Sequence, residues 1–202
     1  MLLPERLEPN FLLRAYASGI FPMADHRGRI SWYAPDPRAV LEHERLRVSR
    51  SLRATIRRAR FAIRVDSCFE QVMRACAAPR ADGEGTWISD EFVGCYGVLH
   101  EHGFAHSVEA WRDGCLVGGL YGVSIGAAFM GESMFSRETD ASKVCLVSLV
   151  ERLRTRGYRL HDTQFLTPHL ERMGAGLISR AEYERRLHAA VAIPCSFDGG
   201  PI

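Results

Sequence analysis

The stretch AHSVEAWRDGCLVGGLYGVSIGAAFM, residues 105–130, indicates the fold class because it combines strand-forming residues with two turn signals. The pair Asp113-Gly114 is typical of a two-residue hairpin turn, and Gly126 marks a second turn. Three antiparallel strands are therefore predicted, at residues 105–111, 116–124 and 127–130. They would form the centre of a mostly antiparallel sheet.

Helical patterns flank this hairpin in the sequence. Ser49 can cap a helix that runs to Arg58, and Ser179 with Glu182 forms a capping box for the last helix. Apolar periodicity and turn signals predict helices at residues 50–58, 69–76, 90–103, 141–156 and 180–190, a polar loop at 79–85, and further strands at 61–65 and 158–162. The pattern predicts an α+β domain in which helices flank the sheet.

The first residues predict a smaller unit. Asn10 can act as the N-cap of a short helix at residues 11–17, and Gly19 can end that helix in a left-handed conformation. Phe21-Pro22 favours extended backbone, residues 29–33 resemble a strand, and a Pro-Asp-Pro turn follows at 35–37. We therefore expect a small N-terminal lobe at residues 1–37 and the main domain at 38–202.

The composition fits a globular enzyme, because 47% of the 202 residues are hydrophobic and can form an ordinary core. The first residues do not combine a basic start with a following apolar segment, so we expect no signal peptide. No stretch approaches the roughly 18 uninterrupted apolar residues that a membrane helix needs. We expect a soluble cytoplasmic protein without membrane association, and a monomer, since nothing in the sequence requires a partner chain.

Cysteine and histidine positions do not predict a metal site. The six cysteines lie far apart without a C-x-x-C pair, which indicates reduced core thiols. His100, Glu101 and His102 lie near His106, but side chains two residues apart on a helix point to nearly opposite sides and cannot share an ion. We therefore expect neither a metal nor a cofactor.

Positive charge is concentrated in one segment although the net charge of the chain is only +2. From Arg45 to Arg64 there are eight arginines and no acid. On the predicted helix, Leu52 and Ile56 fall on one side and Arg50, Arg53 and Arg57 on the other. Such a block is either a solvated surface or a binding site for an anionic partner.

Several segments together resemble one enzyme family. They are Gly19-Ile-Phe-Pro22, Trp32-Tyr-Ala-Pro-Asp-Pro-Arg38, Gly85-Thr-Trp-Ile88, His106-Ser-Val-Glu109, Gly118-Gly-Leu-Tyr-Gly122, Gly131-Glu-Ser-Met-Phe-Ser136, Ala141-Ser-Lys143 and Asp162-Thr-Gln164. In this order they resemble the leucyl/phenylalanyl-tRNA–protein transferases, from about residue 11 to residue 183. The resemblance implies a small N-terminal lobe joined to an acetyltransferase-like (GNAT-type) domain.

The resemblance also implies an activity and a site. Members transfer leucine, phenylalanine or sometimes methionine from aminoacyl-tRNA to proteins that begin with Arg or Lys, which creates a destabilising N-terminus for degradation. Carried over by motif, the substrate-binding residues are Met23, Trp87, Phe129, Glu132, Leu149, Leu153 and His161, and the catalytic residues are Asp162 and Gln164. Three departures from some members leave the choice among the three amino acids open: Met23 replaces a Trp, Leu149 and Leu153 can be aromatic, and His161 replaces an aliphatic residue.

The residues are compatible with this chemistry. An aminoacyl ester is already activated, and an α-amino group with a pKa of roughly 7.7 to 8 is partly neutral, so positioning can dominate catalysis. On an extended strand, Asp162 and Gln164 would share one face. Gln164 would accept a hydrogen bond from the attacking amine, while Asp162 orients Gln164 or relays the proton. The alternative is an Asp-x-Gln sequence that only closes a turn.

The other candidates also have structural alternatives. Glu132 would pair with the basic side chain of the acceptor, or serve as a cap or a structural ion pair. Leu149 and Leu153 could be plain core, and Trp87 is the better pocket candidate. The tRNA acceptor stem would be bound through its phosphates by Arg50, Arg53, Arg57 and Arg58. Lys143 would either contact phosphate near the 3′ end or cap a helix.

Two rival functions differ in class. An acyl-CoA N-acyltransferase needs an Arg/Gln-x-x-Gly-x-Gly/Ala loop that opens a helix, and the nearest segment, residues 171–176, begins with an acid. A non-catalytic RNA-binding module would rest on the arginine-rich helix alone and would bind tRNA without transferring an amino acid.

Overall fold

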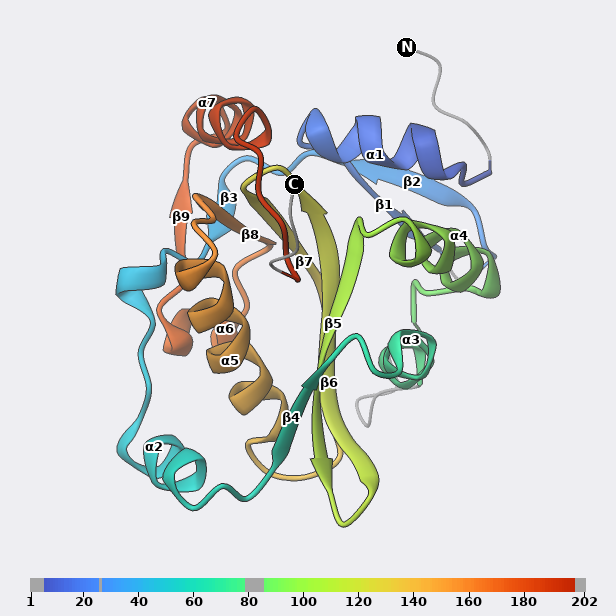
Figure 1. Ribbon diagram of the computed structural model, residues 1–202. Helices are drawn as coiled ribbons and strands as arrows, with labels where there is room; N and C mark the ends of the chain where they lie inside the picture. Colours follow the sequence, from blue (N-terminus) through green and yellow to red (C-terminus); the bar gives the residue numbers. More distant parts are fainter. Residues whose placement is uncertain (1–5, 26, 79–85, 199–202) are drawn as a thin grey trace.

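The structure is a computed structural model that describes residues 6–25, 27–78 and 86–198, so the predicted polar loop at 79–85 lies outside the described residues. Two sheets organise the fold (Figure 1). In the smaller one, β1 (Phe21–Ala24) pairs antiparallel with β2 (Ile30–Tyr33). The larger sheet has seven strands in the order β4-β5-β6-β7-β8-β3-β9.

The predicted hairpin forms the centre of the large sheet. Strands β4 (Ala62–Val65), β5 (Ala105–Arg112), β6 (Cys115–Ile125) and β7 (Ala128–Ser136) are antiparallel neighbours. On the other side of β7, β8 (Leu160–Gln164) runs parallel to it, and β3 (Arg38–Val40) and β9 (Gly176–Ile178) complete the sheet in antiparallel pairs. The predicted mostly antiparallel sheet is confirmed.

Strands β7 and β8 separate after a short paired segment. They pair only where Ala128–Met130 meets Leu160–Asp162, although β7 continues to Ser136 beside β6. The β6–β7 register shifts so that Tyr121 faces Ser133 and Gly122 faces Gly131, which makes Glu132 the extra residue of a β-bulge. A bulge redirects a side chain, and here it lies where β7 has lost β8 as a neighbour.

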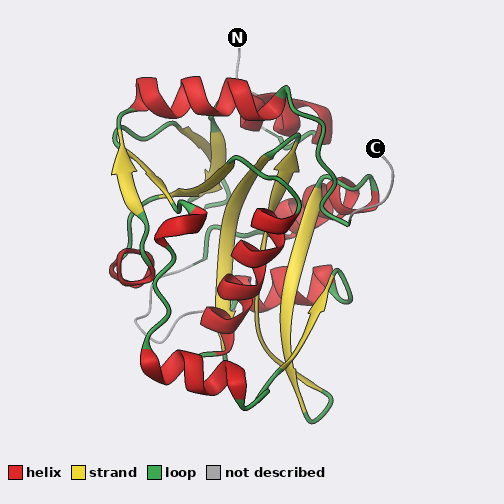
Figure 2. Cartoon of the chain, turned by 60° about the vertical axis from the view of Figure 1, so that its left-hand side comes forward, coloured by secondary structure: helices red, strands yellow, loops and turns green. Residues whose placement is uncertain are grey.

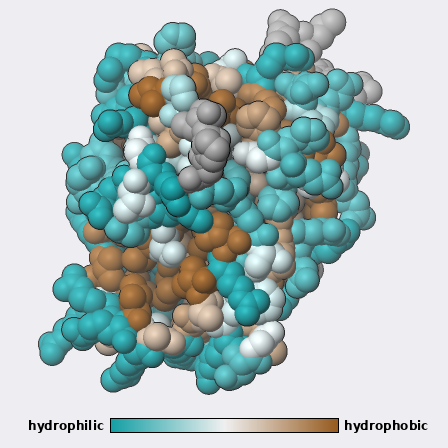
Figure 3. Space-filling model, in the orientation of Figure 1, coloured by the Kyte–Doolittle hydropathy of each residue, from teal (hydrophilic) through white to brown (hydrophobic). Residues whose placement is uncertain are grey.

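Helices cover both faces of the large sheet (Figures 1 and 2). One face packs against α3 (Phe69–Ala77), α4 (Asp90–Glu101) and α1 (Pro9–Ala17), and the other against α5 (Ala141–Thr155). The remaining helices are α2 (Arg50–Arg57), η1 (His43–Arg45), α6 (Pro168–Met173) and α7 (Arg180–Val191). Hydrophobic surface is visible in Figure 3 over α5 and toward α2.

The segment predicted to form an N-terminal lobe contributes to the same core as the rest of the chain. Leu12 and Tyr16 of α1 lie in one buried cluster with Phe92 and Tyr96 of α4, and the Tyr16 and Tyr96 hydroxyls are hydrogen-bonded to each other. This packing positions α1 against the large sheet, although β1 and β2 form a sheet of their own.

Most predicted helices and strands are present, with differences at their ends. Ser49 and Ser179 cap α2 and α7 as predicted, accepting hydrogen bonds from the backbone N–H groups of Leu52 and Glu182. Asn10 is not a cap, because α1 begins at Pro9, and Ser89 occupies the cap position of α4. Strand β7 extends six residues beyond its predicted end at 130, and β3 and α6 were not predicted.

Within the described residues, no helix has both the length and the apolar character that crossing a bilayer requires.

Candidate active site

A cavity of about 430 Å³ lies at the point where β7 and β8 separate. Residues of α5 and α6 close it on one side, and Met23 and Trp87 reach it from the N-terminal lobe and the segment before α4. Its apolar wall consists of Met23, Trp87, Leu120, Met134, Leu146, Leu149, Phe165 and Leu170, and its polar groups include Tyr121, Glu132, His161, Thr163, Gln164 and His169. A mostly apolar cavity with a few polar groups is typical of a small-molecule site.

Glu132 is the acid in the wall of this cavity. Its Oε1 accepts a hydrogen bond of 2.6 Å from Gln164 Nε2, and the Tyr96 hydroxyl donates to Oε2 at 3.5 Å. The pKa of Glu132 is raised to about 8, mainly by burial; the hydrogen bond from Tyr16 opposes the shift, and the nearby Asp162 charge contributes to it. The carboxyl is therefore mostly protonated near neutral pH, and a cation beside it would favour ionisation.

Asp162 does not line the cavity. Its carboxylate is fully buried and pairs with Arg38, and it also accepts hydrogen bonds from the Tyr183 hydroxyl at 2.7 Å and from the Gln164 backbone N–H at 2.8 Å. Gln164 has a φ of 62°, so the extended backbone expected there is wrong. Asp162 and Gln164 point in different directions, and only Gln164 reaches the cavity.

The arginine-rich segment forms α2 at one end of the molecule, at the bottom of Figure 1. Over the described part of the chain, Arg50, Arg53, Arg57 and Arg58 form no ion pair with an acid. Arg53 donates only to the Val48 carbonyl, at 3.4 Å. This differs from α7, whose arginines pair with acids of the same helix.

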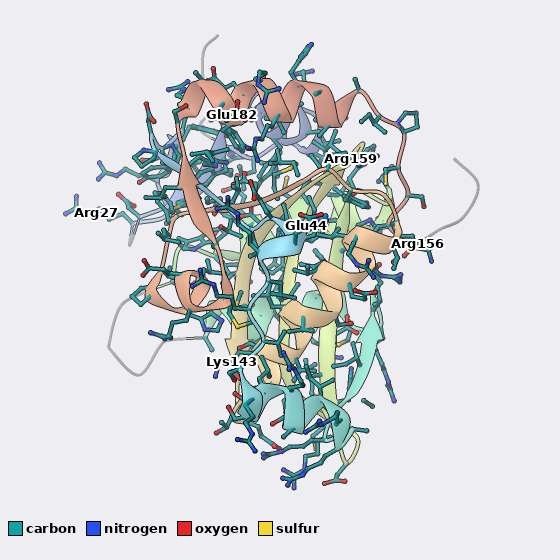
Figure 4. The ribbon with its side chains drawn as sticks, turned by 90° about the vertical axis from the view of Figure 1, so that its left-hand side faces the viewer. Arg27, Glu44, Lys143, Arg156, Arg159 and Glu182 are labelled. Atoms are coloured by element: carbon teal, nitrogen blue, oxygen red, sulfur yellow. The ribbon has the colours of Figure 1, made fainter. Side chains whose placement is uncertain are left out.

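Lys143 lies close to α2, as Figure 4 shows. Its Nζ pairs with Asp140 at 2.8 Å, and the same carboxylate accepts a hydrogen bond from Thr55 of α2. Lys143 therefore stands at the junction of α2 and α5.

Sequence comparisons place this geometry in a known context. The sequence signature of the leucyl/phenylalanyl-tRNA protein transferases matches residues 40–188, and that of their N-terminal domain matches residues 5–36. The chain belongs to this family. It is 55% identical over 194 residues to the leucyl/phenylalanyl-tRNA–protein transferase of Paramagnetospirillum magneticum, covering 95% of this chain and 93% of that protein. It is 54% identical to the one from Herpetosiphon aurantiacus, covering 96% and 99%.

Solved structures with a similar arrangement of elements are more distant. A GCN5-related N-acetyltransferase-like protein from Streptococcus suis is 16% identical with a TM-score of 0.39, over 84% of this chain and 64% of that one. L-PGS from Bacillus licheniformis is 11% identical with a TM-score of 0.40, over 82% and 55%. At these scores the likeness carries no argument about function.

The structure brings together part of the pocket expected for a leucyl/phenylalanyl-tRNA–protein transferase. Met23, Trp87, Leu149 and His161 line the cavity together with Glu132 and Gln164. Phe129 and Leu153 are buried outside the lining: Phe129 stacks on Phe197 and meets the His161 ring edge-on, and Leu153 belongs to the core cluster beneath α5. Both are core residues that do not line the cavity.

His161 is a neutral group at this position. Burial, with His43 nearby, lowers the pKa of His161 to about 3. Among the residues that the structure describes, its Nδ1 has no hydrogen-bond partner, and neither do the Tyr121 hydroxyl, Thr163 Oγ1 and His169 Nε2, all of which belong to cavity-lining residues. Residues that line one cavity thus contribute four buried polar atoms that have no partner within the described chain.

Sequence reasoning missed several residues around this candidate site. Arg38, Tyr16, Tyr96 and Tyr183 surround Asp162 and Glu132. Arg38 could have been noticed, because it is the last residue of the family motif at Trp32–Arg38. Nothing in the sequence indicated that its side chain is buried. Tyr16 and Tyr96 looked like ordinary apolar positions of two separate helices.

Two rival sites can be checked against the geometry. Residues 171–176 close α6 and lead into β9, so they do not form a loop that opens a helix as CoA binding requires. Of the residues described, Asp66, His106 and Asp198 bring potential metal-ligand atoms within 4.8 Å of one another. Both His106 nitrogens already bond to Asp66 Oδ2 and the Gly103 carbonyl, so this arrangement is a hydrogen-bonded anchor for β5.

Proposed function

We propose that this enzyme transfers leucine, phenylalanine or methionine from aminoacyl-tRNA to the α-amino group of proteins that begin with Arg or Lys, and that the product is a destabilising N-terminus. One observation carries the proposal: in a chain of this family, an apolar cavity ends at the hydrogen-bonded pair Glu132 and Gln164. The apolar wall suits the donor side chain, and Glu132 suits a cationic acceptor.

The reaction needs no external energy source. The neutral acceptor amine attacks the ester carbonyl carbon, a C–N bond forms, and the bond between that carbon and the ribose oxygen breaks. The amine nitrogen loses one proton and the ribose oxygen gains one, so the products are an amide and a tRNA with a free hydroxyl. Holding amine and ester together supplies about 7 to 11 kcal/mol of the barrier reduction.

Gln164 is suited to orient the attacking amine. Its Nε2 is engaged by Glu132, which leaves Oε1 as the acceptor for an N–H of the amine. Glu132 ionises when the guanidinium or ammonium of the acceptor approaches, so the same contact recognises the first residue of the acceptor. Met23, Trp87, Leu149 and His161 contact the donor side chain, whereas Phe129 and Leu153 are core residues that do not line the cavity.

The arginines of α2 are proposed to hold the acceptor stem of the tRNA. Their lack of acid partners leaves their charge available to phosphates. Lys143 extends this positive surface toward α5. We also propose that residues 1–37 form the N-terminal lobe. We further propose that the enzyme is a monomer in the cytoplasm, the compartment in which aminoacyl-tRNA is supplied.

A direct assay tests the function. The protein is incubated with radiolabelled leucyl-, phenylalanyl- or methionyl-tRNA and peptides that begin with Arg, Lys or Gln, without CoA or ATP. We expect labelled peptide for Arg and Lys acceptors, and a loss of at least tenfold in rate in the Gln164→Ala variant with unchanged tRNA affinity. Binding of tRNA without labelled peptide would instead support an RNA-binding module.

A further inference from the structure

Arg38 has a guanidinium that is only 1% exposed. It lies between two aromatic rings, with Cζ 4.7 Å from the Phe21 centroid and 4.5 Å from the Tyr183 centroid. Nε and Nη2 donate to the two oxygens of Asp162 at 2.9 and 2.6 Å, and Nη1 donates to the Gly19 carbonyl at 3.2 Å. The side chain therefore joins the N-terminal lobe, α7 and β8 at one point.

The Asp162 carboxylate has no acceptor position left for a substrate. Oδ1 accepts from Arg38 Nε and the Gln164 backbone N–H, and Oδ2 accepts from Arg38 Nη2 and the Tyr183 hydroxyl. Two donors on each oxygen occupy the approximately four lone-pair sites of a carboxylate. Protonating this group would also leave a buried guanidinium without its counter-ion, which is strongly unfavourable.

Through this carboxylate, Arg38 controls the conformation of Gln164. The left-handed φ of 62° at Gln164 is unfavourable for a residue with a side chain, and the charge-assisted hydrogen bond to Asp162 compensates for it. The same conformation turns the Gln164 side chain toward the cavity, where Nε2 reaches Glu132 Oε1 at 2.6 Å. The orientation of the amide thus depends on a fixed Asp162.

We propose that Arg38 is a positioning residue that fixes the Asp162 carboxylate, and that Asp162 holds Gln164 in place without taking a proton from the attacking amine. This inference rests on the proposed transfer reaction. The proton released by the amine goes to the leaving ribose oxygen, and Asp162 acts only through its hydrogen bond to the Gln164 backbone.

A double-mutant cycle on the buried pair tests the proposal. Asp162→Asn keeps an Oδ1 that can accept the Gln164 N–H, and Arg38→Met removes the charge that asparagine no longer balances. We expect kcat to fall about 100-fold in each single variant, because a misplaced reacting group costs about that much, with KM for both substrates within about twofold. The double variant should recover to within about tenfold of wild type. A double variant as slow as Asp162→Asn would overturn the proposal, since it would require the carboxylate itself.

A second variant tests the proposal even if the protein that carries both Asp162→Asn and Arg38→Met does not fold. Arg38→Lys keeps the charge but loses the two-pronged contact. We expect a lower kcat and an unchanged shape of the kcat–pH profile between about pH 6 and 9. A shifted acid limb would show that Asp162 takes a proton and would contradict the proposal. Arg185→Lys, an exposed change on α7, is the matched control and should alter neither quantity.

The backbone amide resonance of Gln164 separates this inference from the proposed function. In wild-type protein we expect it far downfield, and upfield of that position in Arg38→Lys, with or without substrate. An unshifted resonance in Arg38→Lys would overturn the positioning role. A shifted resonance in a protein that labels no acceptor would contradict the transfer reaction and leave the positioning role standing.

Discussion

Glu132 connects the backbone of β7 to the chemistry of the cavity. The bulge at this residue directs its carboxyl toward Gln164 and the Tyr96 hydroxyl. Because burial raises the pKa of Glu132 to about 8, the neutral acid is favoured near neutral pH, and a cationic group beside it would stabilise the anion. This preference is the physical basis of the proposed recognition of a basic first residue of the acceptor by Glu132.

This pKa predicts a pH dependence of stability. The carboxyl titrates near 4.5 when unfolded and near 8 when folded, so its favourable contribution is complete below about pH 4.5, declines as the pH rises, and is lost above about pH 8. We expect Glu132→Gln to remove this decline, which amounts to about 3 to 5 kcal/mol. Urea unfolding at several pH values from 5 to 9 measures it.

Glu138→Gln is the matched control for that experiment. Hydrogen bonds from Arg112 and Arg60 lower the pKa of Glu138, so its contribution is lost only as the pH falls below the usual range of a glutamate. Between pH 5 and 9 this variant should follow the wild type in parallel. If Glu132→Gln also runs parallel to wild type, the raised pKa is wrong.

Acceptor choice gives a second prediction for Glu132. In Glu132→Gln we expect kcat/KM for peptides beginning with Arg or Lys to fall about 10- to 100-fold, the size of a lost charge-assisted hydrogen bond. Peptides beginning with Gln should lose much less. Steady-state rates over the three peptides provide the comparison, and an equal loss for all of them would exclude Glu132 from acceptor recognition.

At the level of elements, α2 predicts a dependence on salt. Arg53→Ala combined with Arg57→Ala should weaken tRNA binding and reduce the slope of log affinity against log salt by about two, roughly one for each lost phosphate contact. The control is Arg154→Ala with Arg185→Ala, because these arginines are already paired with Glu151 and Glu182. Binding titrations at several salt concentrations distinguish the two pairs, and identical slopes would reject α2 as the contact.

The contact of β6 with β7 gives a prediction about packing. A Cβ at Gly122 would lie 2.4 Å from the Met130 carbonyl oxygen and 2.6 Å from the Phe129 ring. We expect Gly122→Ala to destabilise the protein by about 2 kcal/mol or more. Gly94→Ala on α4, where nothing lies within 4 Å, should stabilise it by about 0.5 to 1 kcal/mol. Thermal and urea unfolding of both variants test this contrast.

Local sequence signals predicted the elements that have strong signals of their own. The Asp113-Gly114 turn, the Ser49 and Ser179 caps and the apolar periodicity of α3 and α5 gave helices and strands close to their observed positions. Strand β3 was missed because three residues show no period, and because a strand that starts with a buried arginine looks like a loop.

The site was predictable only in part, because contacts between distant parts of the chain bring its residues together. Glu132 and Gln164 come from different strands, and their motifs identified them, so the sequence could name them without placing them. The direction of Asp162 depends on Arg38, 124 residues away along the chain, and on a left-handed backbone at Gln164 that no propensity indicates. The directions of the Asp162 and Gln164 side chains depend on pairing with a distant residue and on the strained backbone at Gln164. The alternation of side chains along a strand predicts neither.

For the whole molecule, the shared core predicts a single unfolding transition. Leu12 of α1 is fully buried in the cluster that contains Phe92 and Tyr121. We expect Leu12→Ala to lower the free energy of unfolding by about 2 to 5 kcal/mol for the entire chain, with near- and far-ultraviolet circular dichroism changing together. Leu177→Ala, at a side chain that is 50% exposed, should cost less than about 0.5 kcal/mol. Two separate transitions would show that the lobe folds independently.

The position of Arg38 between Phe21 and Tyr183 has a consequence for biosynthesis. A chain growing on the ribosome contains Glu132 and Gln164 before the helix that carries Tyr183 has been synthesised. Until that helix emerges, the guanidinium lacks one of its two rings, and Asp162 lacks one of its donors. Competence to use aminoacyl-tRNA should therefore appear only after Tyr183 has been synthesised and has left the ribosome.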